Sequence, residues 1–191
     1  MEVHGSSWRR GIKNKGVAYC THCDGPLFKD KKVAVIGGGN SGVEAAIELS
    51  SIAKEIILLQ RSDKLKADSV LQEKLKEISN IRVLTNADTK ALKGDSTLKS
   101  IEYENRLNGE IIEEDIDGCF IQIGLVPNTE WTKNVEKNKF GEILVDRDGA
   151  TNIEGVYSAG DCTDCAFKQI VIAQGSGATA SLGAYNYLMR L

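Results

Sequence analysis

Two cysteines separated by two residues carry the most specific chemistry in this chain of 191 residues. Thiols at the spacing of Cys20 and Cys23 can close a small disulfide, so the pair can take up and release two electrons. One sulfur then acts as the thiolate nucleophile and the other resolves the mixed disulfide. Asp24 adjoins the second sulfur, where its carboxyl group could take up and return the accompanying proton. We therefore predict a redox-active disulfide, with Cys20, Cys23 and Asp24 as the catalytic residues.

The same cysteine spacing is also found in half of a zinc site. A zinc site needs two further ligands, and Cys162 and Cys165 have the right spacing but lie most of the chain away. This separation is far beyond the usual knuckle spacing, so we predict no metal. We interpret the second pair as structural, and the alternative is a second redox pair. His22 lies between the two sulfurs of the first pair. It either favours a thiolate when protonated or is an ordinary loop residue.

A glycine-rich turn follows the cysteine pair. Residues 33–36 form an apolar run typical of a strand buried in a parallel sheet, and residues 43–52 have apolar side chains at helical spacing. Between them, glycines stand at the G-x-G-x-x-G positions of a dinucleotide-binding turn. The first glycine permits the tight turn, the second lets a pyrophosphate approach the backbone, and the third lets the helix pack closely. The alternative is a glycine-rich turn of another α/β protein. The predicted cofactor-binding residues are Gly37, Gly38, Gly39, Asn40, Ser41 and Gly42.

The residue after the second apolar strand, 55–60, is placed to read the adenosine ribose of the nucleotide. An acidic residue there would bind both ribose hydroxyls of NADH, whereas Gln60 and Arg61, with Lys66 nearby, offer polar and cationic groups to a 2'-phosphate. This pattern favours NADPH, although a glutamine can also hydrogen-bond a ribose hydroxyl of NADH. Lys64 and Lys66 are equally consistent with solvated surface charge.

The remaining patterns complete an α/β fold. Residues 68–79 have the spacing of an amphipathic helix, and 81–84 are expected to form a third parallel strand. Three short alternating runs follow, and Asn108-Gly109 between the last two is a strong hairpin signal, so we predict an antiparallel meander. Residues 119–124 form another buried strand, in which Cys119 is expected to be inert core. The meander runs are 90–93, 98–106 and 110–112.

Composition argues against several function classes. A net charge of −3 argues against nucleic-acid binding. The sequence has no run long enough to span a bilayer and no signal-peptide core, so we expect no membrane association. Five cysteines form no small-scaffold disulfide pattern, which fits a reducing cytoplasm.

Taken together, these motifs resemble the low-molecular-weight thioredoxin reductases, class II pyridine nucleotide-disulfide oxidoreductases, and within them the flavoprotein subunits of bacterial alkyl hydroperoxide reductases. The matching segments are GVAYCTHCDGPLF at 16–28, VAVIGGGNSGVEAAIEL at 33–49, IGLVPNT at 123–129, TNIEGVYSAGDC at 151–162 and KQIVIAQGSGA at 168–178. The resemblance implies that Cys23 faces the flavin, Cys20 exchanges with the protein substrate and Asp24 is their acid–base partner. It further implies that Gly160 and Asp161 contact the ribityl chain of FAD and that Gln169 and Ile170 face its ring system.

The resemblance also sets the expected domains. Family members open with an FAD-binding half that carries its own glycine fingerprint, and no such segment precedes Cys20 here. We expect residues 1–10 to be a remnant of the FAD domain with a linker, 11–115 a Rossmann-like NAD(P)H domain, and 116–191 an incomplete FAD-binding domain. Full-length relatives are expected to be homodimers.

The expected activity follows from these domains. Electrons would pass from NADPH or NADH through FAD to Cys20 and Cys23. From there they would reach a disulfide on a thioredoxin-like protein or a peroxiredoxin-system partner. The alternative is an NAD(P)H-binding module without flavin turnover.

Overall fold

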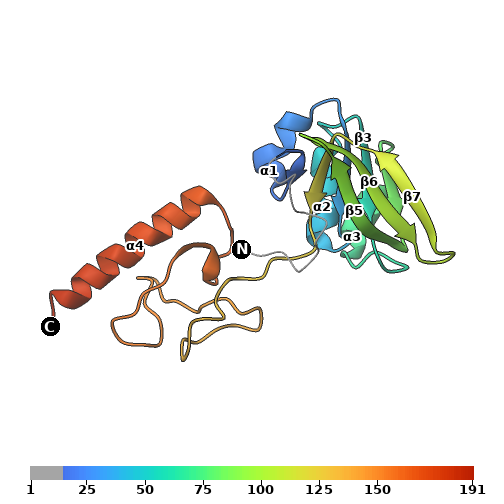
Figure 1. Ribbon diagram of the computed structural model, residues 1–191. Coiled ribbons are helices and arrows are strands. Elements are labelled where there is room, and N and C mark those ends of the chain that lie inside the picture. The colour runs from blue at the N-terminus through green and yellow to red at the C-terminus, as the bar shows by residue number, and fades with distance from the viewer. Residues whose placement is uncertain (1–14) are drawn as a thin grey trace. The chain divides into compact units, whose positions relative to one another are not determined.

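The computed structural model describes residues 15–191, so the predicted remnant and linker at 1–10 lie outside the described residues. The described residues form two compact units, one continuing to Gly124 and the other running from Leu125 to Leu191 (Figure 1). Each unit is described by itself.

A five-stranded parallel sheet forms the centre of the first unit. Its strands β2 and β3 are almost wholly buried, as their continuous apolar runs predict. The third predicted strand, β4, pairs parallel to β3 and confirms that prediction. In spatial order the strands are β1 (Val17–Ala18), β8 (Gly118–Ile121), β2 (Lys32–Ile36), β3 (Glu55–Leu59) and β4 (Ile81–Leu84).

Helices pack on this sheet and close its core. The apolar face of α2 (Asn40–Leu49) buries Val43, Ala46 and Leu49 in the main hydrophobic cluster. The helix α3 (Ser69–Lys76) is shorter than the predicted 68–79. A short helix α1 (Thr21–Asp24) and a 3₁₀ helix η2 (Gly25–Phe28) lead into β2, and the Phe28 ring packs edge-on against Phe120 of β8.

The predicted antiparallel meander is confirmed as a second sheet of three strands, β5 (Ala87–Gly94), β6 (Leu98–Asn105) and β7 (Glu110–Asp115). Glu114 ties this sheet to the parallel one, because its carboxylate pairs with Arg82 and Lys32 and accepts a 2.7 Å hydrogen bond from Tyr103. Burial alone would raise the pKa of Glu114, but these partners outweigh burial and hold that pKa below its usual value. Burial and the Glu114 carboxylate raise the pKa of Tyr103 to about 12.

The strand β8 belongs to a different unit from the one predicted from the sequence. Placing residues 116–191 in a second domain separated this strand from the nucleotide unit, whereas the structure pairs β8 with both β1 and β2 and continues the unit to Gly124. The sequence of a buried apolar strand does not show which domain contains it, and only its pairing with neighbouring strands assigns it to a domain.

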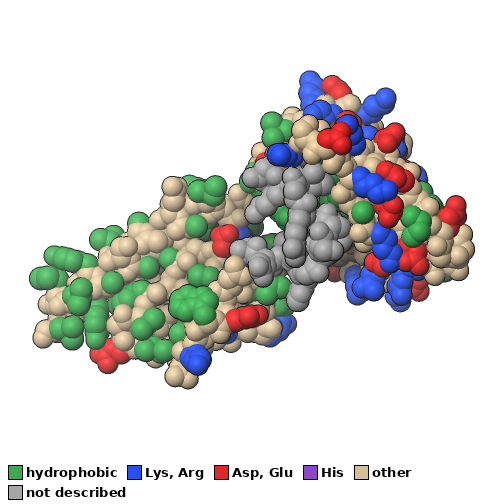
Figure 2. All heavy atoms as spheres, in the orientation of Figure 1, with side chains coloured by type: hydrophobic (Ala, Val, Ile, Leu, Met, Phe, Trp, Pro, Cys, Tyr) green, Lys and Arg blue, Asp and Glu red, His purple; other side chains and the backbone are tan. Residues whose placement is uncertain are grey.

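The second unit is built around one long helix, α4 (Ile170–Leu188), against which the 3₁₀ helix η3 (Gly160–Cys162) packs. Only two residues of α4, Ala180 and Gly183, are buried. On the face drawn in Figure 2, apolar side chains are prominent on this unit, whereas lysine, arginine and acidic side chains are prominent on the other. Within the described residues, no helix combines the length and apolar character needed to cross a membrane.

Candidate redox and nucleotide site

The predicted redox turn and the predicted glycine turn follow strands on either side of β8. Cys20 comes two residues after β1, and Gly37 follows β2 directly. Both strands pair in parallel with β8, so all three end at the same edge of the sheet. The chain runs from β2 towards β3 on one side and returns as β8 on the other, which makes this edge a topological switch point. Open α/β sheets bind ligands at such a point.

Each fingerprint glycine has a distinct structural reason. Gly37 has a φ of +120°, and a Cβ there would overlap the backbone oxygen of Gln122. A Cβ at Gly42 would overlap the backbone oxygen of Gly37, so this glycine permits close packing of α2 on the turn. A Cβ at Gly39 would have no atom of residues 15–191 within 4 Å beyond its chain neighbours. The space beside Gly39 is therefore open to a ligand, as the pyrophosphate of a dinucleotide requires.

The start of α2 fits an anion. Gly39 is the N-cap residue and makes no side-chain capping bond, so the first N–H groups of the helix are not satisfied by that residue. Unpaired N–H groups and the helix dipole together favour a phosphate at such a terminus. Asn40 and Ser41 are exposed at this end.

The segment that follows β3 is fastened to the glycine turn. Gln60 is buried, and its Oε1 accepts a 2.9 Å hydrogen bond from the Gly38 N–H, while its Nε2 donates to Ser62 Oγ. The Lys66 N–H donates to the Gly38 oxygen at 2.7 Å. We predicted that Gln60 binds the ribose, and the structure shows that its side-chain amide is already hydrogen-bonded to the glycine turn. A second fastening joins Asn40 and Asp68 by two hydrogen bonds.

Arg61, the residue after the buried Gln60, has an accessible side chain. Its side chain is 71% exposed and lies 3.3 Å from the Asp88 carboxylate. Exposed ion pairs of this kind contribute about 0–1 kcal/mol, so a phosphate dianion could displace Asp88. Lys64 and Lys66 are also exposed.

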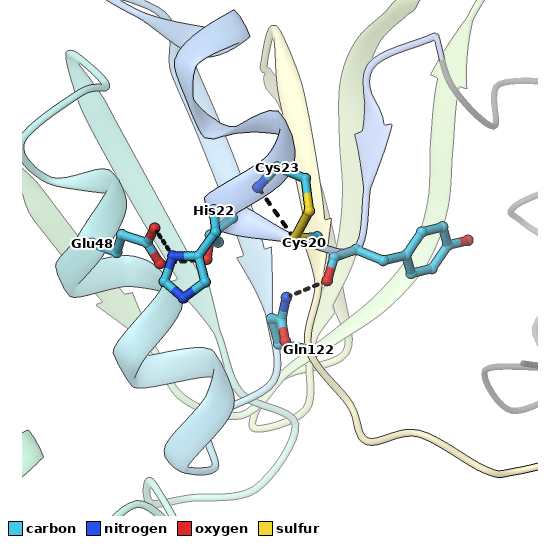
Figure 3. Close-up of a disulfide and its surroundings, with 7 residues drawn as sticks. Cys20, His22, Cys23, Glu48 and Gln122 are labelled. Carbon is cyan, nitrogen blue, oxygen red and sulfur yellow. Dashed lines mark hydrogen bonds and ion pairs between the residues drawn. A yellow bond between two sulfur atoms is a disulfide. The ribbon is translucent and has the colours of Figure 1, made fainter. Parts of the chain in front are cut away.

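Cys20 and Cys23 form a disulfide at the start of α1 (Figure 3). The Cys23 N–H donates a 3.2 Å hydrogen bond to Cys20 Sγ. In the dithiol form the same donor would favour a thiolate on Cys20. Asp24 is half-buried directly beside the pair, and its carboxylate makes no hydrogen bond or ion pair with any part of the chain that the structure describes.

Two side chains that the sequence did not single out hold the redox turn. Glu48, in the last turn of α2, pairs with His22 Nδ1 and accepts a 2.5 Å hydrogen bond from Thr21 Oγ1 (Figure 3). Gln122 Nε2 donates to the Tyr19 oxygen at 3.0 Å, just before Cys20. Gln122 was detectable as a polar residue within an apolar run, whereas Glu48 gave no signal distinguishing it from a solvated helix charge.

Most of this chain is similar to known proteins. Residues 3–177 match the family described as pyridine nucleotide-disulphide oxidoreductase. The chain belongs to this family.

Individual pyridine nucleotide-disulphide oxidoreductases confirm the resemblance predicted from the motifs. NADH dehydrogenase of Bacillus subtilis (strain 168) is 53% identical over 194 residues, which cover 97% of this chain and 38% of that protein. An alkyl hydroperoxide reductase subunit of Escherichia coli (strain K12) is 50% identical over 195 residues, covering 97% and 37%. The crystal structure of thioredoxin reductase from Streptococcus pyogenes MGAS5005 superposes with a TM-score of 0.86 at 33% identity, covering 93% of this chain and 58% of that chain. The chain thus spans 37–38% of the length of these two curated relatives.

Pyridine nucleotide-disulphide oxidoreductases depend on a flavin as well as a nucleotide, and the predicted flavin residues lie in the second unit. Gly160 has a φ of +78° and donates its N–H to Ser176 Oγ in α4 at 3.0 Å. Asp161 is exposed beside it and does not cap α4, whose N-cap is Gln169. Ile170 is 80% exposed. The structure therefore gathers the four predicted flavin residues near the N-terminal end of α4.

Cys165, from the second cysteine pair, lies beside Lys168. Its Nζ lies 2.9 Å from the Glu142 carboxylate, donates to the oxygens of Thr163 and Cys165, and lies 3.7 Å from Cys165 Sγ. Burial opposes the charge of Lys168, but Glu142 and Cys165 outweigh burial and raise its pKa. No cluster of metal-binding side chains occurs among residues 15–191. A structural role for Cys162 and Cys165 stays a prediction.

Proposed function

We propose that this chain serves an NADPH- or NADH-dependent, FAD-linked reductase of protein disulfides, in which Cys20 and Cys23 carry the electron pair. The observation that carries this proposal is the position of Gln122. Its side chain binds the Tyr19 oxygen ahead of the redox turn, while its backbone oxygen borders Gly37 of the glycine turn. A disulfide and a dinucleotide-binding turn thus share one edge of one sheet.

The nucleotide is proposed to bind through the N-terminus of α2. Its pyrophosphate would accept hydrogen bonds from the first N–H groups of the helix and lie over Gly39, where a Cβ would find open space. Arg61 is proposed to decide between NADPH and NADH, because Gln60 is engaged by Gly38 and Arg61 is exposed.

The disulfide chemistry is proposed to start at Cys20. A Cys20 thiolate, favoured by the Cys23 N–H, attacks a disulfide of the partner and releases one partner sulfur as a thiolate. The Cys23 thiolate then attacks Cys20 Sγ, which releases the second partner sulfur and re-forms the Cys20–Cys23 disulfide. The partner gains two electrons and, after protonation, two thiols. Asp24, the next residue in the sequence, is proposed to exchange protons with Cys23.

The flavin is proposed to be held in part by the second unit. The residues present fit such a group, because an exposed Asp161 carboxylate and a helix start that has no side-chain capping bond lie at the same end of α4. Asp161 would accept hydrogen bonds from ribityl hydroxyls, and the α4 N-terminus would favour negative charge on the ring system. A bound flavin would supply the electron pair that reduces the cysteine disulfide. The partner is proposed to be a thioredoxin-like protein or a peroxiredoxin.

Two measurements on the 191-residue chain test this proposal. After reduction by dithiothreitol and removal of the reagent, the chain should transfer its electron pair to an oxidised thioredoxin, and Cys20→Ser or Cys23→Ser should abolish transfer. The matched control, Cys162→Ser, should transfer normally. Fluorescence titration should show binding of NADPH or NADH. Nucleotide binding without transfer would support the alternative of a binding module, and absence of both would refute the proposal.

A further inference from the structure

One carboxylate contacts both residues that separate the two redox cysteines. Glu48 Oε2 accepts a 2.5 Å hydrogen bond from Thr21 Oγ1, and Glu48 Oε1 pairs with His22 Nδ1 (Figure 3). Thr21 is buried, and the Glu48 side chain is 30% exposed, so the Thr21 contact is shielded from water. The His22 side chain is 76% exposed, so its contact is the weaker of the two.

We infer that Glu48 is a positioning residue that holds the Cys20–Cys23 turn in its disulfide form. When the disulfide is reduced, the sulfurs must separate to the distance of unbonded atoms, and Thr21 and His22 must move with the turn. Two contacts on a single rigid helix resist that movement. Glu48 therefore stabilises the disulfide relative to the dithiol and makes the dithiol a stronger reductant. This inference rests on the proposed redox use of the pair.

The helix that carries Glu48 makes this restraint firm. Leu49, next in sequence, is fully buried in the core. Gly25 directly follows α1, and a Cβ there would lie 3.5 Å from the side chains of Ile52 and Leu49, which is van der Waals contact. The helices α1 and α2 therefore lie close together. Glu48 is thus anchored by core packing and does not depend on the redox turn for its position.

The chain offers a matched set of variants. Glu48→Ala removes both contacts, Glu48→Gln keeps two polar atoms in place without the charge, and Thr21→Val removes one contact at nearly constant shape. Glu44→Ala is the control, because Glu44 lies one turn earlier on α2, is exposed, and makes no side-chain hydrogen bond or ion pair with the described residues.

The experiment is equilibration of the folded 191-residue chain with reduced and oxidised glutathione at constant pH, with free thiols counted after alkylation. We expect Glu48→Ala to lower the equilibrium constant for disulfide formation about tenfold, a midpoint potential about 30 mV less negative. Thr21→Val should lower it about threefold. Glu48→Gln and Glu44→Ala should stay within about twofold of the parent chain.

Several results would overturn the inference. A Glu48→Ala chain that melts at a lower temperature but keeps the parent potential would show that Glu48 has only a structural role. An equal effect of Glu48→Gln and Glu48→Ala would show that the charge matters and not the position. If Glu48→Ala does not fold, an unchanged potential in Thr21→Val would be decisive. Failure of the parent disulfide to equilibrate at all would instead refute the proposed function.

Discussion

Substituting alanine at two fingerprint glycines should separate binding from folding. At Gly39 the backbone has a φ of −85° and a ψ of −176°, which alanine adopts readily, and the added methyl group would meet no atom in the part of the chain that the structure describes. The loss of a preferred N-cap residue is partly offset by a less flexible unfolded chain, so stability should change by less than about 1 kcal/mol. The methyl group would, however, occupy the space proposed for the pyrophosphate.

The expected loss of affinity follows from the hydrogen bonds that the methyl group would prevent. A backbone N–H bond to a charged phosphate contributes about 1.5–3 kcal/mol, so losing one such bond weakens binding roughly 10- to 150-fold. At Gly42 the same methyl group would overlap the backbone oxygen of Gly37, which cannot rotate away as a side chain can. We therefore expect Gly42→Ala to cost at least about 2 kcal/mol of unfolding free energy.

The two variants are compared by nucleotide titration and by denaturant unfolding of the same 191-residue chain. Gly39→Ala should fold normally and bind NADPH and NADH weakly. Gly42→Ala should lose stability. Wild-type affinity in Gly39→Ala would show that the pyrophosphate does not approach this turn, and wild-type stability in Gly42→Ala would refute the packing argument.

Three further predictions concern charge and thiols. Arg61→Ala should weaken NADPH binding about tenfold in fluorescence titrations, since it removes a cation from the 2'-phosphate, and should leave NADH binding within about twofold; equal losses for both nucleotides would assign Arg61 to the surface alone. Glu114→Gln should lower the unfolding free energy by about 1–3 kcal/mol at pH 7, as judged by urea unfolding. The folded-state pKa of Glu114 is lowered, so its contribution to the unfolding free energy is fully present above the unfolded-state pKa of about 4.3 and is lost as the pH falls through the folded-state pKa. A stability difference between the parent chain and Glu114→Gln that persists unchanged to pH 2 would contradict this reasoning. Cys119, fully buried in β8, should resist a thiol reagent in the native chain, whereas Cys20 and Cys23 should react once dithiothreitol has reduced the disulfide; rapid labelling of Cys119, detected by mass spectrometry, would place it outside the core.

Local patterns predicted most of the elements of the first unit. The apolar runs at β2 and β3, the helical spacing of α2 and the Asn108-Gly109 turn each depend on neighbouring residues, and each has the predicted structure. The glycine spacing likewise predicted a strand, turn and helix with the conformations that the structure has.

The features that the sequence could not predict all depend on residues far apart in the chain. The neighbours of β8 are set by pairing with strands from the beginning of the chain, so the boundary after residue 115 had no local signal to correct it. Gln60 was expected at a ribose, and its bond to Gly38 exists only once the segment after β3 folds back. Glu48 lies on α2 and contacts Thr21 of α1, and no spacing rule connects residues that lie on different helices.

The position of β8 has a consequence for the order in which the chain becomes structured. Residues 20 and 23 are synthesised before the strand that separates β1 from β2, because β8 follows the whole antiparallel sheet in the sequence. Until Gly118–Ile121 emerges, β1 lacks the strand with which it pairs in the described structure, and Gln122 is not available to hold the Tyr19 oxygen. The redox turn that holds the two cysteines is therefore completed only after β8 and Gln122 have been added. Throughout that interval both thiols belong to a turn that lacks its Gln122 contact.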